Sequence, residues 1–208
     1  MSKIFKLWFT IVVAFKKFIT FITIKIISIL KYRKTVTAAI ICHEQNIDNI
    51  KKIIECQTKQ PDKIVLYYSN KYFGDISTDW DIIKCPDLND WGHGKCKQAI
   101  EEAITDFICF LNADSHYEPT FLEEMMKRAQ NEFDVVLCDF KHRPECDIIV
   151  TQPIVGGTDR GNILVSVRKA QEVGYNHTKY EADGLFIQDL IEAGATWSRV
   201  DKCLFINK

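Results

Sequence analysis

The pattern of hydrophobic and polar positions changes near residue 35. Residues 1–34 form one stretch in which lysines alternate with bulky apolar side chains. After it, short apolar runs alternate with segments whose apolar residues recur every three or four positions. This alternation is typical of strands and helices in an α/β fold. We therefore expect an N-terminal helix over 1–34 and one folded domain over 35–208.

Residues 1–34 predict an amphipathic helix. At about 100° per residue, the lysines gather on one arc and most of the apolar residues on the opposite arc. The longest uncharged run, Leu7 to Phe15, is shorter than the roughly 20 apolar residues that a membrane span needs. We expect this helix to lie in the interface of an anionic membrane. The alternative is a helix packed on this domain or on a partner protein.

The remaining sequence predicts a mostly parallel sheet flanked by helices. Strands are expected over 35–42, 63–68, 80–85, 106–112, 133–140 and 161–167, and helices near Asp48, over 95–104, after Phe121, before Gly174 and over 183–193. In such sheets, ligands bind beyond the carboxyl ends of the strands. The polar residues just past each strand are therefore the first candidates for chemistry.

Charge and cysteine content narrow the classes of function. Residues 1–35 hold eight lysines or arginines and no acid, and because the whole chain carries −1, residues 36–208 carry −9. An acidic domain is not expected to bind nucleic acid. The eight cysteines are scattered without a CxxC pair, and several lie in apolar runs. This usage disfavours zinc and indicates a reducing, cytoplasmic environment.

Asn112 and Asp114 follow the most apolar of the predicted strands. They are separated by one residue, in the segment "FLNADSHYEP". Mg²⁺ or Mn²⁺ bound with a diphosphate takes only one or two protein carboxylates and fills its other positions with phosphate and water. A metal site at this strand tip is one interpretation. The other is that Asp114 caps the helix that follows.

Four segments in this order resemble glycosyltransferase family 2, which has the GT-A fold. The segment "TVTAAIICHEQNIDNIKKIIECQTKQPDKIVLYYSN" resembles the family's opening strand, helix and strand, and "GHGKCKQAIEEAITDFICFLNADSHYEPTFLEEM" resembles its central helix and DxD-type motif. The segments "GNILVSVRKAQEVGY" and "YEADGLFIQDLIEAG" resemble its acceptor-side strand and the helix with the catalytic base. The resemblance spans about residues 36–205. It implies a Rossmann-like, mixed but mostly parallel sheet flanked by helices.

The resemblance also implies catalytic roles. Asp114 corresponds to the ligand of Mn²⁺ or Mg²⁺, and Asn112 stands where many members have the first aspartate, which suggests a ribose or water contact. Asp183 corresponds to the general base, with Glu181 two residues before it. A carboxylate there takes the proton of the attacking acceptor hydroxyl, in a single displacement with inversion. Asp183 as a helix N-cap is the structural alternative, and the two roles are compatible.

Donor-binding residues are expected in three loops. His43, Glu44 and Gln45 match the loop that lines the nucleoside pocket in the family. Asn70 follows the second strand, where the family usually has aspartates, so the nucleotide is not fixed by sequence. Lys95, after the glycines of "DWGHGKCKQA", suits a diphosphate, although this stretch is also typical of a plain surface turn.

Acceptor-binding residues are expected just before the acceptor-side strand. Gly156, Gly157 and Asp159 of "PIVGGTDRGN" are the candidates. His93 and His116 are also close in sequence to the expected metal site. We do not include them among its ligands, because histidines in loops are commonly only solvated.

The sequence therefore predicts an inverting, hexosyltransferase-type enzyme that moves a sugar from a nucleotide-diphosphate sugar to a saccharide or lipid-linked acceptor. We expect it to act peripherally at the cytoplasmic face of a membrane, in surface glycan synthesis. A catalytically degenerate GT-A module that serves as a membrane-tethered scaffold is one alternative, supported by Asn112. A sugar nucleotidyltransferase is another, although "CHEQN" replaces the glycine-rich basic signature expected after its first strand.

Overall fold

The computed structural model describes residues 15–23, 33–42, 47–69, 79–86, 88 and 90–207. The chain divides into two compact units, Met1–Arg33 and Lys34–Lys208. In the first unit, residues 15–23 form a helix whose side chains are all exposed. Residues 33–35 belong to no helix, whereas the prediction extends the helix to residue 34. The other residues of the predicted N-terminal helix lie outside the described part of the chain.

The helix over 15–23 has two chemically different sides. At about 100° per residue, the exposed Phe15, Phe18, Ile19 and Ile22 share one side, and the lysines at 16 and 17 lie on the other. Within the described residues, no helix combines the length and apolar character that a membrane crossing requires.

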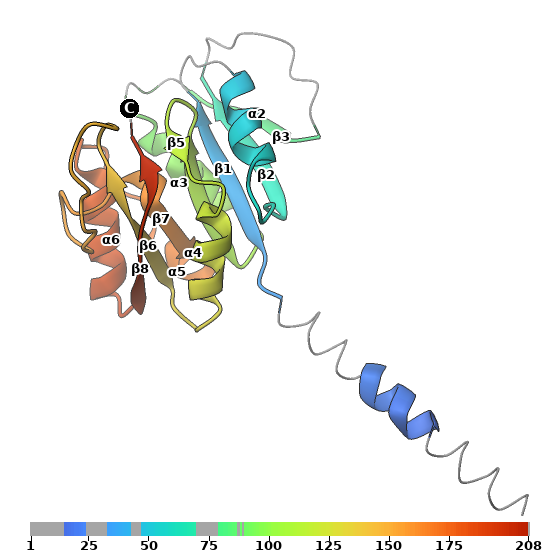
Figure 1. Cartoon of the computed structure of the whole chain (residues 1–208). Coiled ribbons are helices and arrows are strands. Elements are labelled where there is room, and N and C mark those ends of the chain that lie inside the picture. Colours follow the sequence, from blue (N-terminus) through green and yellow to red (C-terminus); the bar gives the residue numbers. More distant parts are fainter. Residues whose placement is uncertain are drawn as a thin grey trace, which may run out of the picture. The chain divides into compact units, whose positions relative to one another are not determined.

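The second unit is a sheet with helices on both faces (Figure 1). Its elements are β1 (Val36–Cys42), α2 (Ile47–Glu55), β2 (Lys63–Tyr68), β3 (Asp81–Lys84), α3 (His93–Glu102), β4 (Phe107–Asn112), β5 (His116–Tyr117), α4 (Phe121–Ala129), β6 (Val135–Lys141), the 3-10 turn η1 (Arg160–Asn162), β7 (Ile163–Ser166), α5 (Val167–Val173), α6 (Ala182–Glu192) and β8 (Trp197–Ile206). The predicted mixed, mostly parallel sheet flanked by helices is confirmed.

The direction of each strand decides which residues meet at the sheet's edge. The strand order is β3-β2-β1-β4-β7-β6-β8-β5. The first four strands in the order, β3, β2, β1 and β4, all run in the same direction. Strand β7 is antiparallel to both of its neighbours, β4 and β6, and β8 is parallel to β6. The carboxyl ends of β4, β6 and β8 therefore lie at the same edge as the beginning of β7. Residues from four distant parts of the chain converge there.

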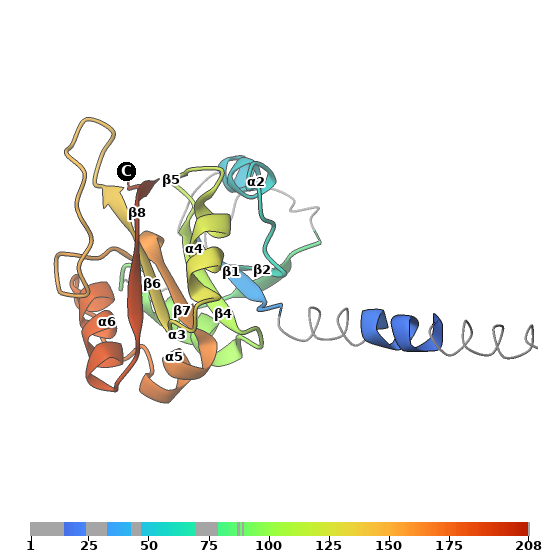
Figure 2. The same cartoon turned by 60° about the horizontal axis from the view of Figure 1, so that its bottom comes forward.

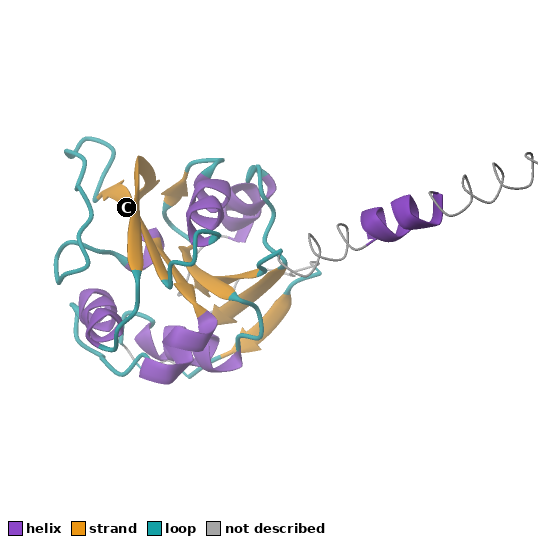
Figure 3. Ribbon diagram, turned by 90° about the horizontal axis from the view of Figure 1, so that it is seen from below, coloured by secondary structure: helices purple, strands orange, loops and turns teal. Residues whose placement is uncertain are grey.

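The core consists of two apolar layers, one on each face of the sheet. Helices α2 and α4 cover one face, and α3, α5 and α6 cover the other (Figure 2 and Figure 3). Every residue of β1 is buried, because its alternate side chains enter opposite layers: Ala38 and Ile40 face α2 and α4, and Ala39 and Ile41 face the other helices. This explains why the strand reads as an unbroken apolar run.

Two strands were not predicted from the sequence. β8 carries Arg199, Asp201 and Lys202 among its apolar residues, and its register against β6 shifts on both sides of Asp139. An irregular, partly exposed strand gives no clean alternation of polar and apolar residues. β5 is only two residues long and is defined by its pairing with the end of β8.

Tyr117 fixes the tip of β4 from inside the core. Its ring lies 5.0 Å from both the Phe121 ring and the Phe205 ring. Its hydroxyl accepts a hydrogen bond of 2.9 Å from the backbone amide of Asn112. Gly161 lies directly above this cluster, since a Cβ there would be 2.3 Å from the Phe205 ring. The aromatic cluster thus supports both β4 and η1 from below.

We predict that Tyr117→Phe destabilises the domain. The change leaves the buried amide of Asn112 without its partner, which costs about 1–3 kcal/mol. Urea unfolding of the full chain measures this loss. Tyr180→Phe makes the same chemical change at a side chain that is 73% exposed, and should shift stability by less than about 0.5 kcal/mol. Equal stability of the Tyr117 variant and the wild type would contradict this role.

Candidate active site

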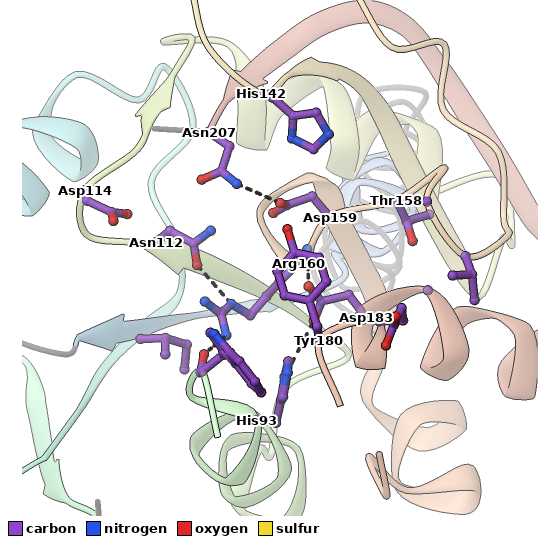
Figure 4. A pocket seen from close by; sticks show the side chains of 16 residues that line it. His93, Asn112, Asp114, His142, Thr158, Asp159, Arg160, Tyr180, Asp183 and Asn207 are labelled. Carbon is purple, nitrogen blue, oxygen red and sulfur yellow. Dashed lines mark hydrogen bonds and ion pairs between the residues drawn. The ribbon is translucent and has the colours of Figure 1, made fainter. Parts of the chain in front are cut away.

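A pocket of about 670 Å³ opens at the edge where these strand ends converge. Sixteen residues line it: Ile41, Trp91, His93, Asn112, Asp114, His142, Val155, Gly156, Thr158, Asp159, Arg160, Tyr180, Glu181, Asp183, Gly184 and Asn207 (Figure 4). They come from the ends of β1, β4, β6 and β8, from the loop that leads into η1, and from the starts of α3 and α6. The pocket is therefore a direct product of the strand order.

The structure brings together six of the residues expected from the sequence. Asn112, Asp114, Gly156, Asp159, Glu181 and Asp183 all line the pocket. Lys95 does not line it, and its side chain is buried in α3. Gly157 is also outside the lining, and its carbonyl accepts from the hydroxyl of Thr151. His43, Glu44, Gln45 and Asn70 lie outside the described residues.

Asp114 lies just beyond the carboxyl end of β4. Its carboxylate is exposed and accepts a hydrogen bond of 3.3 Å from the Ser115 hydroxyl. It does not cap α4, whose N-cap is Thr120. Figure 4 shows Asp114 and Asp183 at opposite ends of the pocket, with Arg160 between them.

Asp183 lies in the first turn of α6, and Glu181 occupies the N-cap position. The Asp183 carboxylate does not cap its own helix. One of its oxygens accepts a hydrogen bond of 2.5 Å from the Tyr175 hydroxyl, and the other accepts one of 3.1 Å from the backbone amide of Arg160. These two donors fix the orientation of the carboxylate.

The buried His93 side chain packs next to Tyr175 and Asp183. Its Nδ1 lies 3.1 Å from the Tyr175 oxygen and 3.9 Å from Asp183, and its ring stacks on that of Tyr175. Burial lowers the pKa of His93 below its usual value, although the Asp183 carboxylate opposes this shift. Burial, followed by the Asp183 charge, raises the pKa of Tyr175 far above its usual value. At neutral pH the tyrosine therefore stays protonated, and its hydroxyl donates a hydrogen bond to Asp183.

Arg160 joins three walls of the pocket. Its Nε donates to the side-chain oxygen of Asn112 over 2.9 Å, and Nη1 donates to the backbone carbonyl of Trp91 over 2.9 Å. Its own backbone amide donates to Asp183. The tip of β4, the turn before α3 and the start of α6 are thus connected through one residue.

Asp159 closes the side of the pocket next to β8. Its carboxylate accepts hydrogen bonds of 2.9 Å from the Gly161 amide and from the Asn207 side chain, which follows β8. Asn162 completes a capping box with it, which holds η1 in place. Burial raises the pKa of Asp159 to about 6, and the Asp183 carboxylate adds to this shift.

The donor set fits a metal ion that arrives together with a phosphate-bearing ligand. Among the described residues, no group of three or more His, Cys, Asp or Glu side chains is arranged to hold a metal. The side-chain oxygen of Asn112 is already bonded to Arg160. The exposed Asp114 carboxylate remains, and Mg²⁺ commonly needs only one or two such groups when substrate phosphates supply the rest.

Several residues that line the pocket or hold its side chains in place carried no signal that sequence reasoning could assign. Arg160, Tyr175 and Asn207 act through side-chain contacts with residues 8 to 69 positions away along the chain. His93 was set aside as a loop histidine but lies next to the Asp183 cluster. His116, also set aside, is not in the lining and faces Glu118.

We predict that Asp159 makes stability depend on pH. A carboxyl whose folded-state pKa is raised favours folding while it is protonated, and this contribution is lost as the pH rises through the folded pKa of about 6. Between pH 4 and pH 7 the wild type should therefore lose about 2 kcal/mol relative to Asp159→Asn. Urea unfolding of both proteins across this range measures the difference. Parallel curves would contradict the raised pKa.

Comparison with known proteins places this geometry in a family. The family model described as glycosyl transferase family 2 matches residues 40–161. Comparison with the sequences of curated proteins gives no match.

Solved structures of low sequence identity share the fold. The structure of S. aureus TarS 1–349 has a TM-score of 0.63 at 12% identity, and the match covers 84% of this chain and 60% of that one. The glucosyl-3-phosphoglycerate synthase from Mycobacterium tuberculosis, in complex with Mn²⁺, UDP and phosphoglyceric acid, has a TM-score of 0.63 at 13% identity, with coverage of 86% and 72%. This chain thus spans 60% of the TarS fragment, which is less than two thirds of it. Because the family model matches more than half of its residues, the chain belongs to glycosyl transferase family 2 and has the GT-A fold.

Proposed function

We propose that this protein transfers a sugar from a nucleotide-diphosphate sugar to an acceptor hydroxyl, in one displacement that inverts the anomeric centre. The observation that carries the proposal is the pocket itself: an exposed carboxylate, Asp114, at one end and an oriented carboxylate, Asp183, at the other. Membership of glycosyl transferase family 2 supports the reaction class.

Asp183 is the proposed general base. Each of its oxygens accepts one hydrogen bond from the protein, from Tyr175 or from the Arg160 amide, so each keeps a further lone pair. As the acceptor oxygen bonds to the anomeric carbon, its proton passes to Asp183, and the bond between that carbon and the diphosphate oxygen breaks. The fixed donors hold the carboxylate in position for this transfer. Glu181, exposed at the pocket rim two residues before it, is proposed to assist in binding the acceptor.

Asp114 is the proposed ligand of Mn²⁺ or Mg²⁺. A bound divalent ion offsets the negative charge that develops on the departing diphosphate. Asn112 and Arg160 are proposed to line the path of the diphosphate between Asp114 and Asp183. Related folds support this choice of ligands: the synthase from M. tuberculosis was solved with Mn²⁺ and UDP, and with Mg²⁺ and UDP, and TarS 1–349 was solved with UDP-GlcNAc.

We also propose that the enzyme works peripherally at the cytoplasmic face of a membrane, on a saccharide or lipid-linked acceptor in surface glycan synthesis. The support is the helix over 15–23, whose exposed Phe15, Phe18 and Ile22 share one side. The eight basic residues within 1–35 add attraction to anionic lipid. Such attachment raises the effective concentration of enzyme near a membrane-bound acceptor.

We predict that neutralising Asp183 and neutralising Asp114 affect different kinetic properties of the enzyme. A screen of UDP- and GDP-sugars, with and without Mn²⁺, would identify the donor. With that donor, Asp183→Asn should lower kcat by about 10²- to 10⁴-fold, because a general base is lost. Asp114→Asn should abolish the stimulation by Mn²⁺.

Two carboxylates outside the pocket provide matched controls. Glu192→Gln neutralises an exposed residue at the last position of α6. Glu118→Gln neutralises a half-buried carboxylate four residues beyond Asp114. Both should keep full activity. Full transfer by Asp183→Asn would remove that residue from the proposal. A ligand present at 100 times its Kd adds about 2.7 kcal/mol to the free energy of unfolding and so raises the melting temperature. If no UDP or GDP compound with Mn²⁺ raised the melting temperature, a scaffold would be favoured over an enzyme.

We predict that the full chain binds vesicles that contain anionic phosphatidylglycerol. Lys16→Glu combined with Lys17→Glu should weaken this binding by at least about 30-fold, since each lysine near the surface contributes about 1 kcal/mol. Co-sedimentation at several salt concentrations measures the effect. Asp201→Lys, a charge change on β8 in the other unit, is the control. Equal binding to neutral and anionic vesicles would contradict the proposed attachment.

A further inference from the structure

Two large aromatic side chains are exposed at the mouth of the pocket. Trp91 is 57% exposed and Tyr180 is 73% exposed, and both line the pocket. Their ring centroids are 6.2 Å apart and the ring planes meet at 80°. In this fold most large rings are buried in the two apolar layers, so an exposed pair beside Asp183 calls for a reason other than stability.

The backbone of Trp91 is held in an unfavourable conformation. Its φ is 54°, in the left-handed region that residues other than glycine rarely adopt. The Asp90 carboxylate accepts hydrogen bonds from the amides of Gly92 and Gly94, at 3.0 and 2.7 Å. The Trp91 carbonyl accepts from Arg160. A strained residue that its neighbours hold from both sides is characteristic of ligand sites.

Tyr180 is positioned by the start of α6. It lies three residues before Asp183, in a turn closed by the hydrogen bond from the Ala182 amide to the Lys179 carbonyl. Gly184 brings the helix against the preceding loop, since a Cβ there would lie 2.6 Å from the Cα of Val155. Both rings line the same pocket as the carboxylate that is proposed to receive the acceptor's proton.

The charge of this end of the pocket selects among acceptors. Glu181, Asp183 and Asp159 contribute three carboxyl groups, and Arg160 directs hydrogen bonds to Asn112 and to the Trp91 carbonyl. A phosphorylated or carboxylated acceptor would face like charges here. A neutral sugar ring has apolar C–H faces that can stack on aromatic rings, and hydroxyls that carboxylates can accept from.

We propose that Trp91 and Tyr180 form the acceptor subsite and that the acceptor is a neutral saccharide. Its ring stacks on the face of one aromatic side chain and packs its edge against the other, because the two ring planes meet at 80°, and this directs one hydroxyl toward Asp183. The inference rests on the proposed glycosyl transfer, and it adds the chemical class of the acceptor and two residues that bind it.

Binding of simple sugars tests this subsite without any need for turnover. The full chain, with UDP and Mn²⁺ present, is titrated with methyl glycosides of glucose, galactose and N-acetylglucosamine, and binding is followed by saturation-transfer NMR. We expect at least one glycoside to bind, and Trp91→Gly to weaken that binding at least tenfold. Glycine tolerates the positive φ, so this variant removes the ring without adding strain. Trp91→Phe keeps a ring and should bind within about threefold of the wild type, as should Trp197→Ala on β8.

Kinetics with the identified donor separate this inference from the proposed function. Trp91→Gly and Tyr180→Ala should raise the KM for the glycoside at least tenfold, with a donor KM within about threefold. If the wild type transfers sugar and both variants match it, the subsite is wrong and the proposed function stands. If the wild type turns over no donor, the proposed function fails, and ring-dependent glycoside binding still decides the subsite. Binding of 3-phosphoglycerate in preference to every glycoside would overturn the neutral-saccharide proposal.

Discussion

The arrangement of the pocket depends on the guanidinium and backbone amide of one residue, Arg160. Its side chain donates to Asn112 at the tip of β4 and to the Trp91 carbonyl in the turn before α3, and its amide donates to Asp183 at the start of α6. These three elements carry both ends of the proposed reaction. An asparagine at 112 is well suited to this bond, because a neutral amide oxygen accepts from the guanidinium and leaves Asp114 as the carboxylate at the strand tip.

The strand order explains why Arg160 can reach all three. β7 runs against β4 and β6, so the turn η1 that precedes it lies at the edge where those strands end. The absence of a side chain at Gly161 lets η1 sit on the rings of Phe205 and Tyr117. The same rings support Asn112 through the Tyr117 hydroxyl. The same aromatic cluster therefore stabilises the fold and positions the site, so a change in the cluster should alter both the stability of the domain and the geometry of the pocket.

The sequence revealed those parts of the site that are encoded locally. Asp114 was proposed because it follows an apolar strand, and Asp183 because it begins a helix in a family-like order; both line one pocket. Arg160, Tyr175 and Trp91 could not be found in this way, since their contacts join residues that are distant along the chain and depend on the direction of β7. β8 was missed for a related reason: its charges and its shifted register conceal the alternation that identifies a strand. Helix α3 starts two residues earlier than expected, and Lys95 is buried within it and does not line the pocket.

A crystal structure of the full chain with UDP and Mn²⁺ tests the central claim most directly. The account predicts an anomalous manganese peak within about 2–2.5 Å of the Asp114 carboxylate. It also predicts a diphosphate between that ion and Arg160, with Asp183 beyond it and free to contact an acceptor. A nucleotide bound away from this pocket, or a metal held by other residues with Asp114 turned to solvent, would contradict the account.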